Sequence, residues 1–357
     1  MSAKKTRDLF LTAALVFFAS AAGANSLPFD RGLSVRAAGS SSSLSPFIAG
    51  AQSSYINPAL LAYAAKQEIN CVYFNLFESS LVSSLSYALP LLDLGSFGFS
   101  FIYMSSPEMA GLDANNTVTD VSYSESYIQL GASYGIRVMS IFSAGLSLKY
   151  INHSLTPDNY PAVGMDAGLA ADLPLNSRIS LAVFNVVKPE FKYASGFSDI
   201  LPISADLTLS GKYRISRELS DSLSAGAGLI KSEDSPSYGW NAGIEYSVFD
   251  SLAAARLGIS DSGFSLGGSV SYAGASIDYA YVKTALDFMH RFSISYSFGR
   301  DIRQLEEELR TKEDKLKYEL VQKIRQDALI ELKEQITSAS VKGDLESARE
   351  ALQKALV

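Results

Sequence analysis

The sequence predicts an all-β transmembrane barrel of about fourteen antiparallel strands, with an amino-terminal plug and a carboxy-terminal α-helical extension. Three observations support this fold class. The body of the chain alternates large apolar residues with small polar ones, most clearly over residues 289–298. That body is rich in aromatic residues and poor in charge. Immediately after residue 298 the composition changes to a charged sequence with helical periodicity.

The distribution of charge separates the body of the chain from the extension. Residues 299–357 contain 12 of the 30 Lys and Arg residues and 13 of the 37 Asp and Glu residues, but only one of the 39 aromatic residues. Charged residues make up about 14% of residues 1–298, against about 25% in a typical soluble domain. A secreted β-sandwich, whose strands also alternate, is the alternative fold. The low charge favours the membrane barrel.

An export signal is predicted over residues 1–24. Basic residues precede an apolar run at 9–18, and small residues at 22–24 supply a cleavage site. The mature chain is therefore expected to begin at Asn25. The apolar run has ten residues, which is too short for a membrane-spanning helix of roughly 20 residues.

Fourteen segments of about ten residues, each with a period of two, are expected to form the wall of a barrel over residues 68–298. They are residues 68–77, 81–89, 94–104, 122–136, 140–152, 162–173, 178–187, 201–213, 222–230, 238–249, 251–259, 263–272, 275–282 and 289–298. In the third segment Phe97 and Phe99 share one face, opposite Gly98 and Ser100. Large residues are expected to face lipid. Ser, Gly and Ala predominate on the lumen side, with few aromatic residues.

The connections between these segments indicate the orientation of the barrel. If the chain enters from the periplasm, the even-numbered connections should be the short ones, and most of them are. Odd-numbered connections such as 105–121 and 188–200 are longer and rich in turn residues. An even number of strands returns the chain to the periplasm. The predicted location is therefore the bacterial outer membrane, with residues 299–357 in the periplasm.

The partners that the sequence predicts are those of a membrane barrel. Outer-membrane lipid is expected around the wall. The outer-membrane assembly machinery is expected to bind the last segment, in which Phe292, Ile294, Tyr296 and Phe298 form a barrel-terminal strand signal. A net charge of −7 without a basic patch argues against nucleic acid as a partner. Cys71 is the only cysteine, so the chain has no internal disulfide.

Residues 25–67 do not alternate and are predicted to form the plug. They are rich in Gly, Ser and Ala and contain Asn57-Pro58-Ala59 shortly before the first strand. A barrel of fourteen strands has a lumen wide enough to need such a plug. Pro58 biases Asn57 away from helical geometry, so Asn57 either caps a short helix over residues 59–65 or makes a functional contact of a hatch. Both can hold together.

This arrangement resembles the FadL-type outer-membrane transporters of hydrophobic compounds, and is closest to their PorV/PorQ-like branch. The resemblance covers roughly residues 30–298. It implies a fourteen-stranded barrel whose amino-terminal segment folds inside as a hatch, with Asn57, Pro58 and Ala59 as the hatch motif. The chain departs from the family pattern at Leu60, where a glycine usually follows the motif. It departs again at 52–54, where Gln and Ser replace the acidic residues that are common there.

The resemblance implies uptake of hydrophobic small molecules, such as long-chain fatty acids, through a hatch-gated lumen. The PorV-like relatives imply a different function, a non-transporting scaffold or shuttle for exported proteins. A third alternative is a tether between the outer membrane and the periplasm through the extension. A continuous apolar pocket in the lumen would favour transport, whereas a closed interior would favour a scaffold.

The extension is expected to form a long amphipathic helix from Arg300. Its apolar residues are spaced by three, four and seven, but the heptad register ends after Leu316, which disfavours a sustained coiled coil. The end of the chain resembles half of a tetratricopeptide repeat, which cannot bury its apolar face alone. It therefore either binds a periplasmic protein or peptidoglycan, or forms a helical hairpin. The predicted partner-binding residues are Gly343, Asp344, Ala348 and Ala355.

The sequence contains no arrangement typical of an enzyme, and no metal or other cofactor is expected. Residues 263–267 match a nucleophile-elbow string, but that motif requires a strand-to-helix turn. His290 should face lipid while Ser265 faces the lumen, so the two cannot form a catalytic pair. Six charged residues in the wall are interpreted as solvated charges of the lumen or its rim. They are Asp166, Asp172, Asp206, Glu245, Arg256 and Asp278.

Overall fold

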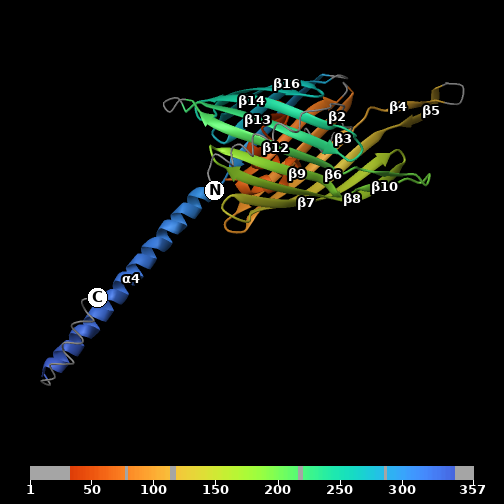
Figure 1. Ribbon diagram of the computed structural model, residues 1–357. Coiled ribbons are helices and arrows are strands. Elements are labelled where there is room, and N and C mark those ends of the chain that lie inside the picture. Colours follow the sequence, from red (N-terminus) through yellow and green to blue (C-terminus); the bar gives the residue numbers. More distant parts are fainter. Residues whose placement is uncertain (1–32, 77–78, 113–117, 216–219, 285–287, 342–357) are drawn as a thin grey trace. The chain divides into compact units, whose positions relative to one another are not determined.

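A computed structural model of the protein describes residues 33–76, 79–112, 118–215, 220–284 and 288–341. The predicted export signal lies outside these residues, as do the predicted partner-binding residues Gly343, Asp344, Ala348 and Ala355. The chain divides into two compact units between Arg300 and Asp301. In the first unit fourteen antiparallel strands close into a barrel (Figure 1). The predicted fold class, an all-β barrel of fourteen strands with a carboxy-terminal helix, is confirmed.

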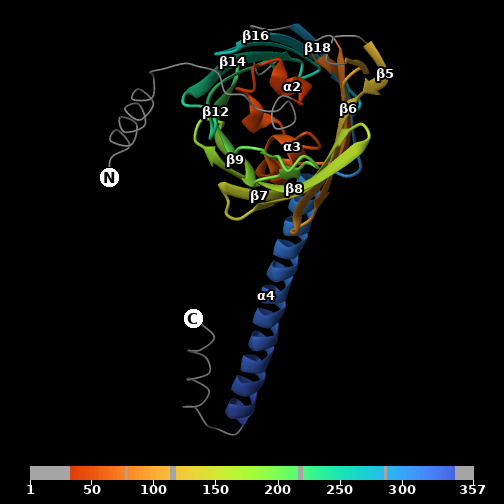
Figure 2. The same ribbon diagram turned by 90° about the vertical axis from the view of Figure 1, so that its right-hand side faces the viewer.

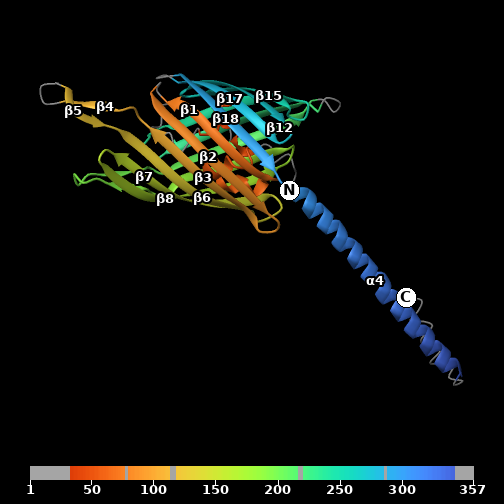
Figure 3. The same cartoon turned by 180° about the vertical axis from the view of Figure 1, so that it is seen from behind.

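Each barrel strand overlaps one of the predicted segments. The strands are β1 (Gln67–Leu76), β2 (Ser80–Leu91), β3 (Gly95–Ser105), β6 (Glu125–Arg137), β7 (Phe142–Leu155), β8 (Asp158–Leu173), β9 (Ser177–Val187), β12 (Ser204–Arg214), β13 (Ser222–Ser232), β14 (Tyr238–Val248), β15 (Ala253–Ser260), β16 (Gly263–Tyr272), β17 (Ala275–Thr284) and β18 (Phe288–Phe298). Each strand pairs with the barrel strands before and after it in the chain. The ring is closed by β1 and β18, with Gln67 opposite Phe298 (Figure 3).

Two connections contain strands that the sequence pattern did not predict. The connection from β3 to β6 holds the hairpin β4 (Met109–Leu112) and β5 (Val118–Tyr123), and that from β9 to β12 holds β10 (Glu190–Lys192) and β11 (Ser198–Ile200). Neither hairpin belongs to the barrel sheet. The longer odd-numbered connections therefore carry short hairpins of their own. Strands of three, four or six residues are too short for a period of two to stand out clearly.

The wall has an apolar outer face and an inner face of small residues. Phe97, Phe99 and Phe101 of β3 are exposed on the outside, whereas Ser100 is buried on the inside. Phe292, Ile294 and Tyr296 of β18 are likewise exposed. Such a band of outward apolar and aromatic side chains is typical of a barrel surrounded by lipid.

The second unit begins with one long helix, α4 (Ile302–Val341), of 40 residues. At 1.5 Å per residue it extends about 60 Å. Leu316, Leu320 and Ile324, spaced by four, lie on one side and are exposed. None of the described helices is long and apolar enough to cross a membrane.

Candidate functional site in the barrel interior

The described part of the predicted plug, residues 33–66, lies inside the ring of strands, where Figure 2 shows it in red and orange. Below it is called the amino-terminal segment. It consists of short turns of helix, namely α2 (Val35–Ala38), η1 (Ser45–Phe47), α3 (Ser53–Ile56) and η2 (Pro58–Tyr63). The α2 helix packs against β16 to β18, and η2 packs against β6 to β8. Most of its side chains are buried.

Glycines on the inner face of the wall make room for this segment. A Cβ atom at Gly226 would overlap the carbonyl oxygen of Ser43, and one at Gly168 would overlap the side-chain oxygen of Asn57. A Cβ atom at Gly39 of the segment would lie 2.9 Å from the Cα atom of Gly267 in β16. The small inward residues that the sequence predicted therefore form a close-fitting seat for the segment.

Asn57 both caps a helical turn and attaches it to the wall. Its Oδ1 atom accepts a hydrogen bond from the backbone N–H of Ala59 at 3.0 Å. Its Nδ2 atom donates to the carbonyl oxygens of Leu169, at 3.4 Å, and Leu181, at 3.3 Å. The helix expected over residues 59–65 is instead the shorter 3₁₀ turn η2, with Pro58 in its first turn and Ala59 fully buried. The helix-cap and wall-contact interpretations of Asn57 thus describe one side chain.

Arg178 of β9 holds the segment from a second side. Its guanidinium lies 3.4 Å from the ring centroid of Tyr63, which is within range of a cation–π interaction. Its Nη1 atom donates to the carbonyl oxygen of Pro46 at 2.9 Å, and its Nε atom donates to Asp172 at 2.7 Å. Arg137 pairs with the same carboxylate at 3.2 Å.

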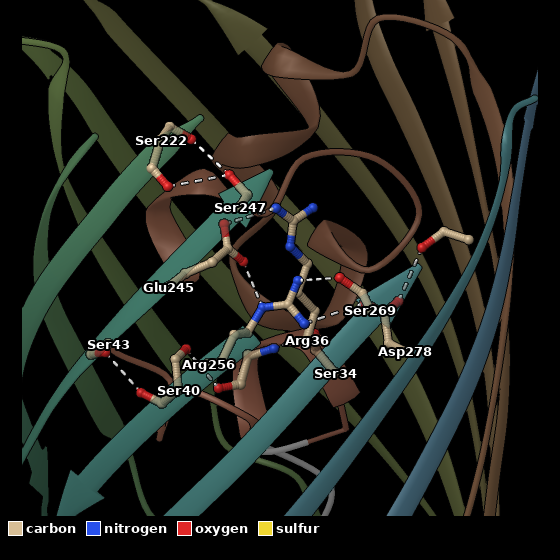
Figure 4. A network of polar contacts seen from close by, with 12 residues as sticks. Ser34, Arg36, Ser40, Ser43, Ser222, Glu245, Ser247, Arg256, Ser269 and Asp278 are labelled. Carbon is tan, nitrogen blue, oxygen red and sulfur yellow. Dashed lines mark hydrogen bonds and ion pairs between the residues drawn. The ribbon is translucent and has the colours of Figure 1, made fainter. Parts of the chain in front are cut away.

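A network of four charges holds the segment from a third side (Figure 4). Arg36 of α2 lies 3.7 Å from Glu245 of β14. Glu245 accepts a hydrogen bond from the Nε atom of Arg256 in β15 at 2.5 Å. Arg256 also pairs with Asp278 of β17 at 3.5 Å and donates to Ser269 at 2.8 Å. The segment is thereby joined to three strands of the wall.

This network corrects the expectation of solvated lumen charges. Glu245, Arg256 and Asp278 are all buried, and Asp166 is buried in an ion pair with Lys149 at 2.9 Å. The physical reason is that the amino-terminal segment fills the space that water would otherwise occupy. Charges without water must find partners of opposite sign.

The interior also contains an apolar region at one end of the barrel. We call this the loop end, because it carries the connections β1–β2, β3–β6, β7–β8 and β9–β12; the opposite end is the turn end. Buried apolar side chains of the wall, the amino-terminal segment and the β9–β12 connection meet there and are called the apolar cluster. They include Leu33, Val35, Tyr55, Phe74, Val82, Ile102, Met104, Tyr127, Ile151, Phe191, Leu201 and Met289. Of its aromatic residues, only Phe74 and Tyr127 belong to wall strands, whereas Tyr55 comes from the amino-terminal segment and Phe191 from the β9–β12 connection.

The cavities around the segment are small or polar. One of about 30 Å³ lies between the segment and β9 and β12, lined in part by Asn57 and Thr208, and has room for about one water molecule. Two grooves of about 500 Å³ and 480 Å³ flank the segment at the turn end. Polar residues including Arg178 line the first, and Arg36 and Glu68 lie in the second. None of these three spaces is a continuous apolar pocket. The apolar cluster is closely packed, and the buried Arg291 lies over the ring of Phe74 at 4.4 Å.

The structure places Ser265 and His290 on opposite faces of the wall, as the sequence predicted. Ser265 is buried in the lumen, whereas His290 is on the outer face, where it bonds the Tyr279 hydroxyl at 2.8 Å. Over the described ranges, no three His, Cys, Asp or Glu residues are placed to hold a metal ion.

No protein-family model and no curated protein matches the sequence. Solved structures with a similar barrel include a FadL homologue from Pseudomonas aeruginosa. It is 14% identical, with 74% of this chain and 98% of that chain covered and a TM-score of 0.49. The toluene transporter TodX of Pseudomonas putida is 15% identical, with coverage of 68% and 91% and a TM-score of 0.42. A KdgM porin gives 13% identity, coverage of 65% and 99%, and a TM-score of 0.31. Likeness at this level assigns no family.

Substitution of a seat glycine should displace the amino-terminal segment. Gly226→Ala places a methyl group against the Ser43 backbone, and we expect it to lower the free energy of unfolding by about 1–3 kcal/mol. Urea unfolding in lipid vesicles, followed by the fluorescence of Trp240, the only tryptophan, measures this. Gly268→Ala is the control, because the nearest atom to its new Cβ is 3.8 Å away. Equal effects of the two variants would contradict the close fit.

Removal of one charge from the network should be costly. Glu245→Gln keeps the shape of the side chain but leaves Arg256 buried with half of its charge compensation, and we expect a loss of about 3 kcal/mol in unfolding free energy. Glu190→Gln breaks the exposed Glu190–Lys192 pair and should change stability by less than about 1 kcal/mol. The same unfolding assay applies, and a Glu245→Gln variant as stable as Glu190→Gln would contradict the role of the network.

Proposed function

We propose that the protein is a bacterial outer-membrane channel that admits hydrophobic small molecules to the apolar cluster and passes them inward past the amino-terminal segment, which acts as a hatch. The observation that carries this proposal is the apolar cluster itself. A barrel that conducted only polar solutes would have a polar, water-filled lumen. Here one end of the lumen is lined by buried apolar side chains such as Phe74, Val82 and Ile102.

The cluster suits an amphiphile with a long apolar chain, such as a long-chain fatty acid. Transfer of apolar surface from water into such a region is favourable by roughly 25 cal/mol per Å². Leu33, Val35 and Tyr55 of the amino-terminal segment are part of the cluster. A ligand that moves from the cluster toward the turn end must therefore pass this segment. Asn57, Pro58 and Ala59 hold the hatch against β8 and β9 in this proposal.

The outer surface supports a place in the outer membrane. The exposed apolar band contacts lipid, and β18, with Phe292, Ile294, Tyr296 and Phe298, is the strand that the assembly machinery recognises. Fourteen strands return the chain to the side from which it entered, so α4 extends into the periplasm.

The helix α4 favours a second function, a tether to the periplasm. Its 40 residues carry exposed apolar side chains, including Leu316, Leu320 and Ile324, along with many charges. A periplasmic protein or peptidoglycan is the partner proposed for this unit. A scaffold for exported proteins belongs to the same class, since it too would work through contacts outside the lumen.

Transport through the cluster predicts that polarity inside it reduces ligand retention. Val82→Thr replaces a fully buried methyl group of the cluster with a hydroxyl, which costs about 1–3 kcal/mol in an apolar site. We expect about tenfold less fatty acid to co-purify with the full chain in mild detergent, measured by mass spectrometry per mole of barrel. Val270→Thr, on the exposed outer face of β16, is the isosteric control and should retain ligand. A barrel that is empty in both variants and in the unchanged protein would contradict transport.

The tether predicts binding that depends on the second unit. The full chain should sediment with purified peptidoglycan, or cross-link to a periplasmic protein, and a chain that ends at Arg300 should do neither. The barrel unit should still fold, because the two units are compact separately. Sedimentation and cross-linking that are the same with and without residues 301–357 would exclude the tether.

A further inference from the structure

The β10–β11 hairpin lies at the loop end and is bonded to the barrel differently from any strand of the wall. Its two strands pair only with each other, with Glu190 opposite Ile200 and Lys192 opposite Ser198. An isolated two-stranded hairpin is marginally stable at best. The hairpin is therefore held in place by its side chains and not by the backbone ladder that joins the wall strands.

Two apolar side chains of this connection are inserted into the apolar cluster. Phe191 is 1% exposed and Leu201 is 3% exposed. The Phe191 ring makes edge contacts with Tyr127, at 6.4 Å between centroids, and with His153, at 5.7 Å. Glu190 and Lys192, on either side of Phe191, are exposed. The hairpin thus has an apolar inner face over the cluster and a polar outer face.

Several polar contacts attach this connection to its neighbours. At Ile203 the backbone carbonyl accepts from the N–H of Glu233 at 2.9 Å, and the backbone N–H donates to the Glu233 carboxylate at 3.2 Å. The Tyr193 hydroxyl lies 3.0 Å from the Nδ1 atom of His153, whose Nε2 atom lies 2.9 Å from Glu125. The His153 ring is also stacked on Tyr127, with 4.0 Å between centroids. On the other side, Lys188 pairs with Glu233 of the β13–β14 connection at 2.6 Å.

The two ends of the connection are joined to each other, which makes it one body. The backbone N–H of Leu201 donates to the carbonyl oxygen of Pro189 at 3.0 Å. The side-chain amide of Asn185 donates to the carbonyl oxygen of Pro202 at 2.9 Å. Asn185 is at a shift in register between β8 and β9 and has a positive φ of 59°. The connection therefore leaves the wall at a narrow neck about which it can turn.

We propose that residues 188–203 form a lid that closes the loop end of the apolar cluster and lifts to admit a hydrophobic ligand. The identity of the ligand rests on the proposed function, whereas the existence of the lid is tested without any ligand. The wall strands are held by continuous backbone ladders. The lid is held by two inserted apolar side chains, by the packing of Tyr193 on Tyr160, and by a small number of polar contacts. Local opening occurs where such contacts are few. The lid is therefore held less tightly than the strands of the wall.

The first test measures access to the cluster without any ligand. In a Cys71→Ser background, Ile102→Cys places a reporter thiol in the cluster under the lid. The rate at which a membrane-impermeant maleimide labels it is measured on cells that carry the full chain in their outer membrane. Tyr193→Phe removes the bond to His153 and keeps the ring, so the labelling rate should rise about two- to tenfold. Tyr87→Phe is the control and should leave the rate unchanged, because the Tyr87 hydroxyl bonds Gln67 at 2.7 Å, at the start of β1 and at the turn end.

Two results of this first test would overturn the lid. One is equal labelling in Tyr193→Phe and Tyr87→Phe. The other is a reporter that never reacts in folded protein although it reacts completely after denaturation.

The second test locks the lid and measures uptake of a radiolabelled long-chain fatty acid. Cysteines at positions 153 and 193, joined by a short reducible cross-linker, should abolish uptake, and reduction should restore it. The control is a pair of cysteines at positions 152 and 159, where the side chains of Asn152 in β7 and Asn159 in β8 are 3.2 Å apart. This cross-link joins two neighbouring wall strands and should leave uptake unchanged. Uptake that continues through the locked lid would overturn this entry route. Absence of uptake in every variant and in the unchanged protein would contradict the proposed function. The existence of the lid would then be decided by the labelling rates of the first test alone.

Discussion

The structure depends on the fit between the backbone of the amino-terminal segment and the glycines of the wall. Fourteen strands enclose a lumen too wide for wall side chains alone to fill. At Gly168 and Gly226 the segment comes so close that a methyl group cannot be accommodated. Because the segment replaces water there, Glu245, Arg256 and Asp278 must satisfy one another. The seat, the charge network and the small size of the enclosed cavity have a common cause.

The same segment lies between the apolar cluster at the loop end and the polar grooves at the turn end. In α2, Val35 joins the apolar cluster while the next residue, Arg36, approaches Glu245. One helical turn therefore presents an apolar side chain to the loop end and a cation to the ion network. A ligand accepted by the apolar cluster would meet Arg36, Glu68 and the polar grooves only after passing this turn. This boundary is where selection between apolar and polar solutes would take place.

The sequence predicted features that are local or periodic and missed those that depend on which strands meet. The strands were predictable because contact with lipid imposes a large residue at every second position, as at Phe97 and Phe99. The cap at Asn57 was predictable from local chemistry, because Pro58 follows it. Its bonds to the Leu169 and Leu181 carbonyl groups were not, since they require the register of a segment inside the barrel.

The charges and the hairpin show the same limit. Glu245 and Arg256 are opposite each other on the neighbouring strands β14 and β15, but Asp278 comes from a third strand, β17. The burial of these three side chains depends on the amino-terminal segment that packs over them. Sequence alone therefore described these residues as solvated. Leu201 continued the alternation of the eighth predicted segment, yet it precedes β12 and packs in the apolar cluster. An apolar residue that a lid inserts into the interior and an apolar residue in a strand have the same pattern in sequence.

The attachments at the two ends of the interior differ in strength, and in the proposed transport this difference sets the order of events. The amino-terminal segment is held by Asn57, by Arg178 and by the Arg36 network, on three sides and over a close-packed seat. The lid is held by the side chains of Phe191 and Leu201 in the apolar cluster and by polar contacts at Tyr193 and Glu233. Opening at the loop end therefore costs less free energy than displacement of the segment. A ligand would enter the apolar cluster faster than it leaves toward the periplasm, and the segment, not the lid, would limit the rate of passage.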